Sequence, residues 1–170
     1  MADMSPSEIG DEMARAGAEF RGIIGGASRD GLRRRSDGTC WTNRQLLFHM
    51  VLGYLVVRTL LPLVRVLGRL GHSRGFAATL NAGRRPFHLI NYAGSVMGGQ
   101  ILTTRAMAAL LDRTLRALQR GLAAETATGL ALTMHFPTAW DPYFRPTMSV
   151  LDVYHFGTQH FDHHRSQLTP

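Results

Sequence analysis

Apolar side chains recur at the spacing of an α-helix over most of the chain, and they predict four main helices. The first runs through EIGDEMARAGAEFRGIIGGAS, and Ser5 or Ser7 can cap its start. The second follows Thr42 or Asn43 as N-cap, and its nearly continuous apolar sequence indicates a helix enclosed by its neighbours. Residues 28–41, between the two, are rich in Gly, Ser, Asp and Arg and are predicted to form a loop.

A third helix is predicted from about Phe87 to Ala124, after a polar, glycine-containing link at 71–85 and with Pro86 in its first turn. Three glycines either bend this helix or let a neighbouring helix pack closely against it: Gly94, Gly98 and Gly99. The apolar stripe that carries the first two of them could equally serve a homodimer.

The segment 126–147 is predicted to be a long structured loop, because it holds three prolines and has no helical period. Loops of this length usually serve a function. The large aromatic residues of the loop can cover a pocket, or they can close one end of the bundle: Phe136, Trp140, Tyr143 and Phe144. The last helix, VLDVYHFGTQHFDHHRSQL, follows Thr147 or Ser149 as N-cap. The whole pattern predicts an all-α fold, a four-helix bundle in which residues 1–170 form one domain with a long loop before the last helix.

Composition narrows the classes of partner. The chain of 170 residues is 45% hydrophobic and 18% charged, which is enough apolar sequence for a folded core. The formal net charge is +7, but the basic residues are all arginines spread along the chain, which argues against a surface for nucleic acid. The single cysteine, Cys40, excludes an internal disulfide and fits a reducing compartment. It is more simply a tolerated small residue than a catalytic thiol, because no basic partner is evident.

One segment, Leu46–Val64, is apolar enough to be compared with a membrane span. It contains His49 and Arg58 and is interrupted by Pro62, and these features favour a buried helix. The N-terminal sequence MADMSPSEIGDEM is acidic and polar, unlike a secretory signal. A cytoplasmic protein with no membrane partner is therefore expected.

The last predicted helix carries the most informative pattern, three histidines within five positions. His160 and His164 emerge one turn apart on one face of a helix, so their imidazoles can bind a single metal ion. The same face carries residues typical of a core: Val153, Phe156 and Gly157. His155 and His163 lie on other faces and are expected outside the metal site.

Two histidines underfill a metal site, because zinc and similar ions usually take at least three protein ligands. His49 is the best candidate for the third, since it lies on the core side of the most apolar helix. A lone histidine there is more often a hydrogen-bonded core residue, but one that faces a His-x-x-x-His pair across a bundle is better explained as a ligand. His88 is a reserve ligand, whereas His72 and His135 are expected to face solvent or to stabilise a loop.

Other residues are expected to support this site or to stay clear of it. Gln45, Gln167 and Asp141 are candidates to orient the ring N–H groups of the ligands or to line the pocket. Tyr154 and Arg165 belong to the last helix but are expected to face away from the site.

The stretches WTNRQLLFHM and TQHFDHHRSQL resemble the DinB-like, or YfiT-like, superfamily of bacterial four-helix metal-binding proteins, and the resemblance extends over nearly the whole chain. Known members bind a divalent ion through one histidine of the second helix and an H-x-x-x-H pair of the last. The resemblance implies His49, His160 and His164 as the ligands, a bundle of the DinB/YfiT type, and the homodimer that this superfamily often shows.

Established activities in the superfamily often concern low-molecular-weight thiols, through mycothiol-dependent isomerisation or S-transfer and bacillithiol transfer. The resemblance therefore implies a metal-dependent S-transferase or thiol-dependent isomerase that acts on a small-molecule substrate, with Zn, Ni or Fe as the divalent ion and mycothiol as co-substrate. Three imidazoles leave a coordination position open, as in catalytic sites. Two alternatives stay open: a metal-dependent hydrolase, and a non-enzymatic stress- or biosynthesis-related bundle that binds a small ligand or a partner chain.

Overall fold

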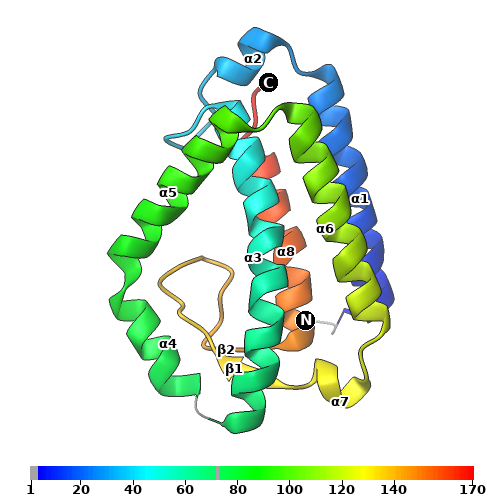
Figure 1. Cartoon of the computed structure of the whole chain (residues 1–170), viewed down its shortest axis with the longest axis vertical. Helices are drawn as coiled ribbons and strands as arrows, with labels where there is room; N and C mark the ends of the chain where they lie inside the picture. Colours follow the sequence, from blue (N-terminus) through cyan, green and yellow to red (C-terminus); the bar gives the residue numbers. More distant parts are fainter. Residues whose placement is uncertain (1–3, 72) are drawn as a thin grey trace.

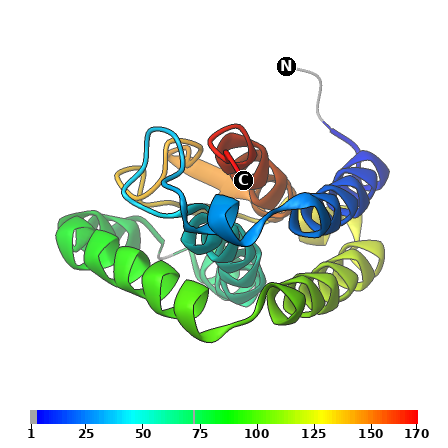
Figure 2. The same ribbon diagram turned by 90° about the horizontal axis from the view of Figure 1, so that it is seen from above.

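The structure, a computed structural model, describes residues 4–71 and 73–170 and confirms the all-α fold. Four long helices form the bundle: α1 (Pro6–Gly26), α3 (Asn43–Leu70), α6 (Thr104–Ala123) and α8 (Val150–Arg165). Helices α1 and α3 each pack against both α6 and α8 (Figures 1 and 2). Outside the bundle, α5 (Arg84–Ile101) packs against α3 and is preceded by α4 (Ser73–Ala82). The shorter elements are α2 (Arg29–Arg33), α7 (Ala127–Leu130), β1 (Thr133–His135) and β2 (Thr147–Ser149).

Three of the bundle helices begin at a reciprocal capping box. Ser5, Thr42 and Ser149 each accept a hydrogen bond from the backbone N–H three residues on, and the side chain at that position accepts the N–H of the cap residue. Each predicted pair of cap candidates contained the residue that caps the helix. Such a cap stabilises a helix by about 1 kcal/mol.

Helix α3 lies at the centre of the core, and this position explains its apolar sequence. Its core-facing side chains are fully buried along most of its length: Leu46, Leu47, Met50, Val51, Tyr54, Val57 and Val64. The helix continues through Pro62 instead of ending there. Within the described part of the chain, α3 is the one helix long and apolar enough to cross a membrane, but the core helix of a soluble protein passes the same test, so α3 does not indicate a membrane protein.

The predicted third helix is wrong in one respect, because it is two helices. Helix α5 ends at Ile101, Leu102 has an extended backbone, and Thr103 caps α6 by accepting the N–H of Ala106 at 3.1 Å. The break therefore occurs at a new cap and not at a glycine. As a result α6 joins the bundle while α5 remains outside it.

Two of the glycines in α5 serve close packing, which was one of the two roles predicted for them. A Cβ at Gly98 would overlap the ring of Phe48, and one at Gly99 would lie 2.8 Å from Gln45 Cα. Helix α5 therefore lies close against α3. A Cβ at Gly94 would meet nothing within 4 Å, and the homodimer stays a prediction.

The link predicted at 71–85 is wrong, because most of it is helix α4. Gly71 ends α3 in the left-handed conformation, with φ of 70°. The chain then forms a helix that packs Phe76 and Ala77 toward the core. The glycines and polar residues of this segment suggested a loop, whereas two apolar residues on one face stabilise a helix.

The segment 126–147 contains more regular structure than predicted. It includes α7 and ends in the antiparallel pairing of β1 with β2, where the buried Met134 and Met148 lie opposite each other. Phe136 and Phe144 are 3% and 9% exposed and belong to the core. These two aromatic residues therefore pack into the core, and closing the end of the bundle or covering a pocket stays a prediction.

Candidate metal centre

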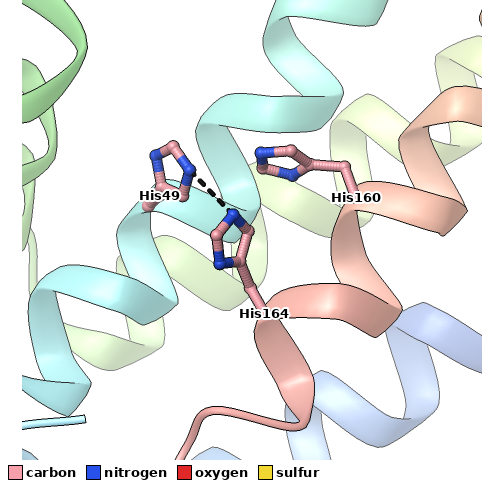
Figure 3. A group of neighbouring side chains, drawn as sticks. All are labelled: His49, His160 and His164. Carbon is pink, nitrogen blue, oxygen red and sulfur yellow. Dashed lines mark hydrogen bonds between the residues drawn. The ribbon is translucent and has the colours of Figure 1, made fainter. Parts of the chain in front are cut away.

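Three histidines come together where α3 faces α8. His49 lies on α3, and His160 and His164 lie one turn apart on α8 (Figure 3). Each ring offers one ligand nitrogen, and these nitrogens all lie within 4.8 Å of one another. His49 and His160 are each 5% exposed, and His164 is half-buried. The structure thus brings together the three residues that the sequence singled out, and the group could hold a metal ion.

Hydrogen bonds at the outer nitrogens of two rings fix the positions of their protons. Ser95 of α5 donates its hydroxyl proton to Asn91 O at 2.8 Å, so its oxygen accepts the Nδ1–H of His49 at 3.1 Å. His164 donates its Nδ1–H to Gln167 Oε1 at 2.7 Å. Each Nε2 atom therefore carries a lone pair. The two Nε2 atoms face each other 3.1 Å apart (dashed line in Figure 3).

The spacing of these two nitrogens fits a shared metal ion. Two lone pairs at this distance repel each other unless a cation lies between them. Zinc–nitrogen bonds of about 2.0–2.1 Å, at angles between octahedral and tetrahedral, separate two ligand nitrogens by about 2.8–3.4 Å. The observed 3.1 Å lies inside that range. A set of imidazole donors suits zinc, nickel, iron or copper, so the residues present fit a divalent transition-metal ion.

Burial keeps the three imidazoles neutral. Loss of hydration is the main cause that lowers the pKa of His49 to about 3 and the pKa of His164 to about 4. The same cause, followed by the neighbouring histidines, lowers the pKa of His160 well below its usual value. Only a neutral imidazole can bind a metal ion, so at neutral pH all three rings have the form that a ligand requires.

His160 occupies space that a glycine of α3 leaves free. A Cβ at Gly53 would lie 2.5 Å from His160 Nδ1 and 2.8 Å from its Cε1. Within the described residues, this Nδ1 is buried without a hydrogen-bond partner. The other ring nitrogen, Nε2, lies 4.0 Å from Asp141 Oδ2. Burial raises the pKa of Asp141, while the N–H of Tyr143 and the nearby His163 act in the opposite direction.

Aromatic rings flank the three histidines on the side of α5. Trp41 stacks on His49, with ring centroids 4.4 Å apart and planes at 27°, and lies edge-on to His164 at 6.3 Å. Tyr92 of α5 stacks on the same indole at 6.1 Å. The indole therefore covers one ligand and touches another.

Two residues beside the histidines were not predicted from the sequence, Ser95 and Trp41. Ser95 could have been found, because it shares a face of its helix with Gly98 and Gly99, and a hydroxyl on a packed face needs a partner. Trp41 directly precedes the cap residue of α3, and no spacing in the sequence indicates that its ring lies against the histidines.

Two of the three residues proposed to support the ligands do lie beside them. Gln167 binds His164, and Asp141 lies near His160. The Oε1 of Gln45 accepts the N–H of Thr42 at 3.0 Å and completes the cap of α3 instead of orienting a ligand, and its place in the pocket stays a prediction.

The remaining histidines and two further residues of α8 have other contacts. His155 lies 3.5 Å from Glu12, and the ring of His163 packs against Tyr143 and also edge-on against the site residue His164. His135 stabilises its strand through Ser73, while His88 is exposed beside Phe87. His72 lies outside the described residues.

Tyr154 and Arg165 face away from the site, toward Arg65 and Glu19 respectively. Cys40 is exposed.

Comparison with known proteins gives one family. The family model of the DinB superfamily matches residues 12–168, which include both segments that carry the three histidines. No curated protein and no solved structure matches the chain significantly.

Proposed function

This chain belongs to the DinB superfamily, and from that premise we propose that it is a divalent-metal-dependent enzyme whose ion is held by His49, His160 and His164. The observation that carries the proposal is the pair of Nε2 atoms of His49 and His164, whose lone pairs face each other 3.1 Å apart. The DinB family is metal-binding, which supports the same residues as ligands.

The protein's own residues hold the site in a form suited to catalysis. Ser95 and Gln167 accept the Nδ1–H groups of two ligands and thereby fix the directions in which their Nε2 atoms point. Trp41 stacks on the ring of His49. A divalent ion with an open coordination position acidifies a thiol or a water molecule that reaches it and polarises a neighbouring carbonyl group.

The reaction that we propose is transfer of a small thiol to an electrophile, or a thiol-dependent isomerisation, with mycothiol as the candidate co-substrate. Family resemblance supports the thiol, and the open coordination position supports a reaction at the centre. In the transfer, the thiol loses its proton and its sulfur forms a bond to carbon of the electrophile, while the bond from that carbon to the leaving group breaks. The leaving group takes the electron pair of the broken bond, and the thiol proton passes to it or to solvent. A cytoplasmic location belongs to the same proposal, because thiols are kept reduced there.

Metal analysis of protein purified without an affinity tag tests the first part of the proposal. We expect about one divalent ion per chain in the native protein and its loss in His160→Ala, because three ligands are then reduced to two. His155→Ala is the matched control on the same helix and should keep the ion, since His155 lies beside Glu12. Equal metal content in His160→Ala and the native protein would refute the assignment.

Thiol consumption tests the second part. Metal-loaded and metal-free protein would each be incubated with an electrophile and with mycothiol, bacillithiol or glutathione, and the thiol consumed would be measured. Both forms would carry Cys40→Ser, because Cys40 is an exposed thiol of the protein itself. The proposal expects thiol consumption only with metal. It would be abandoned if calorimetry showed none of the three thiols to bind, and turnover of esters or amides without thiol would assign a hydrolase instead.

A further inference from the structure

Asp141 lies in the loop between β1 and β2, and this loop is attached to the helices outside the bundle. Trp140 donates its indole N–H to Leu80 O at 2.8 Å and stacks on Phe87, with ring centroids 3.8 Å apart. The backbone N–H of Ala139 donates to Asn81 Oδ1 at 3.1 Å. The residues directly before Asp141 are thus held by α4 and α5, which fixes where its carboxylate lies.

The two oxygens of Asp141 have different surroundings. Oδ1 accepts the backbone N–H of Tyr143 at 2.9 Å, whereas Oδ2 lies 4.0 Å from Nε2 of His160. The side chain is 17% exposed. Among residues 4–71 and 73–170, no arginine nitrogen lies within 4.0 Å of this carboxylate. Asp141 is therefore a mostly buried carboxylate whose nearest ionisable partner is a neutral imidazole.

Glu125 is another largely buried carboxylate and can be compared with Asp141. Its side chain is 11% exposed, and it is paired directly with the guanidinium of Arg65. A buried carboxylate without such a cation is costly, because it loses hydration and gains no opposite charge in return. Among the described residues, Asp141 thus has no directly paired guanidinium like that of Glu125, and His163 is the imidazole whose charge favours its ionised form.

A divalent ion at the three histidines would supply a positive charge. This inference rests on the proposed function. Imidazole binds a metal ion in its neutral form, so three such ligands leave both positive charges of the ion uncompensated. The free oxygen of Asp141 lies 4.0 Å from Nε2 of one of these rings. We propose that Asp141 is the anionic residue of the metal centre, whose negative charge strengthens binding of the divalent ion and weakens binding of an anion at the open position.

Zinc affinity and metal-free stability together test this role. Asp141→Asn removes the charge and keeps an oxygen that can accept the N–H of Tyr143. We expect it to weaken zinc binding at least about tenfold, which corresponds to about 1.4 kcal/mol, and to leave the melting temperature of the metal-free protein unchanged or raised. Glu125→Gln is the matched control, which should lower the melting temperature because Arg65 loses its partner, and should leave zinc affinity within about twofold.

A second measurement isolates the charge. The cobalt-loaded protein would be titrated with azide, and Asp141→Asn should bind azide more tightly than the native protein, because a negative charge beside the open position is gone. Native zinc affinity or unchanged azide affinity in Asp141→Asn would overturn the inference while leaving the histidine site intact. A metal-free melting temperature that falls as in Glu125→Gln would also overturn it, since the role would then be structural. Failure of the native protein to bind zinc would instead reject the proposed function, and this inference with it.

Discussion

Replacing Gly53 by alanine should weaken metal binding far more than it weakens the fold. The new Cβ would lie 2.5 Å from His160 Nδ1, whereas ordinary contacts between heavy atoms begin near 3.4 Å. The overlap is therefore roughly 0.9 Å. The ring of His160 is 5% exposed, so it can relieve this overlap only by turning or moving away from α3. Because His49 belongs to α3, such a movement separates two ligands.

The expected effect on stability is small, because two contributions oppose each other. Overpacking a core costs about 1–3 kcal/mol, and a glycine-to-alanine change inside a helix returns about 0.5–1 kcal/mol. The net loss should be about 0–2.5 kcal/mol. For the metal, even a change that only reorients a ligand weakens affinity by about 10–100-fold. Gly53→Ala displaces a ligand, so we expect zinc affinity to fall at least about 100-fold.

Competition with a chromophoric chelator gives the zinc affinity, and thermal unfolding of the metal-free protein gives the stability. Gly157→Ala is the matched control, because a Cβ there would lie 2.8 Å from Cε1 of Tyr54 and not against a ligand. It should lose a similar amount of stability and keep zinc affinity within a few-fold. If Gly53→Ala bound zinc as tightly as the native protein, the position of His160 would not determine the site, and the reasoning would be wrong.

Three further predictions concern the same centre. Ser95→Ala removes the acceptor of the His49 Nδ1–H, so zinc affinity measured by chelator competition should fall about 10–100-fold, and equal affinity would exclude an orienting role. Removing the metal should lower the stability of the protein. An ion present at 100 times its Kd contributes about 2.7 kcal/mol, which corresponds to about 5–11 °C in Tm for a chain of this size. An unchanged Tm in the presence of a chelator would contradict a site of that affinity. Metal-free protein should lose stability as pH falls from about 6.5 toward 4. In the folded protein the pKa values of His49 and His164 are lowered to about 3 and about 4, so in this pH range the unfolded chain binds more protons than the folded one. Each histidine contributes at most about 1.4 kcal/mol per pH unit, and denaturant unfolding between pH 7 and 5 should show the decrease.

The helical period was sufficient to predict the bundle and the meeting of the three histidines. His160 and His164 share a face because of their spacing, and His49 lies on the core side of an apolar helix. These are local regularities that a packed bundle preserves. The break at Thr103 was not predicted, because a threonine within a helical pattern becomes a cap only when the chain on either side packs in different directions.

The surroundings of the ligands were harder to predict, because they depend on contacts between segments far apart in the sequence. Ser95 reaches His49 because Gly98 and Gly99, one helical turn further along α5, let this helix lie close to α3. Gln45 was proposed beside a ligand, yet it completes a cap three residues away, since a local partner was nearer. Spacing along a helix indicates which face a residue occupies, but not which neighbour reaches it.

Because α5 lies outside the bundle, the residues proposed to bind the metal ion and some of the residues that surround them belong to different helices. The three proposed ligands lie on α3 and α8, two helices of the core, whereas Ser95 and Tyr92 belong to a peripheral helix that packs mainly against α3 (Figure 2). Substitutions on the peripheral helix can therefore alter what approaches the histidines without disturbing the hydrophobic core. Relatives that keep the same ligands could in this way diverge in the compounds they accept, and this chain could be re-engineered by the same route.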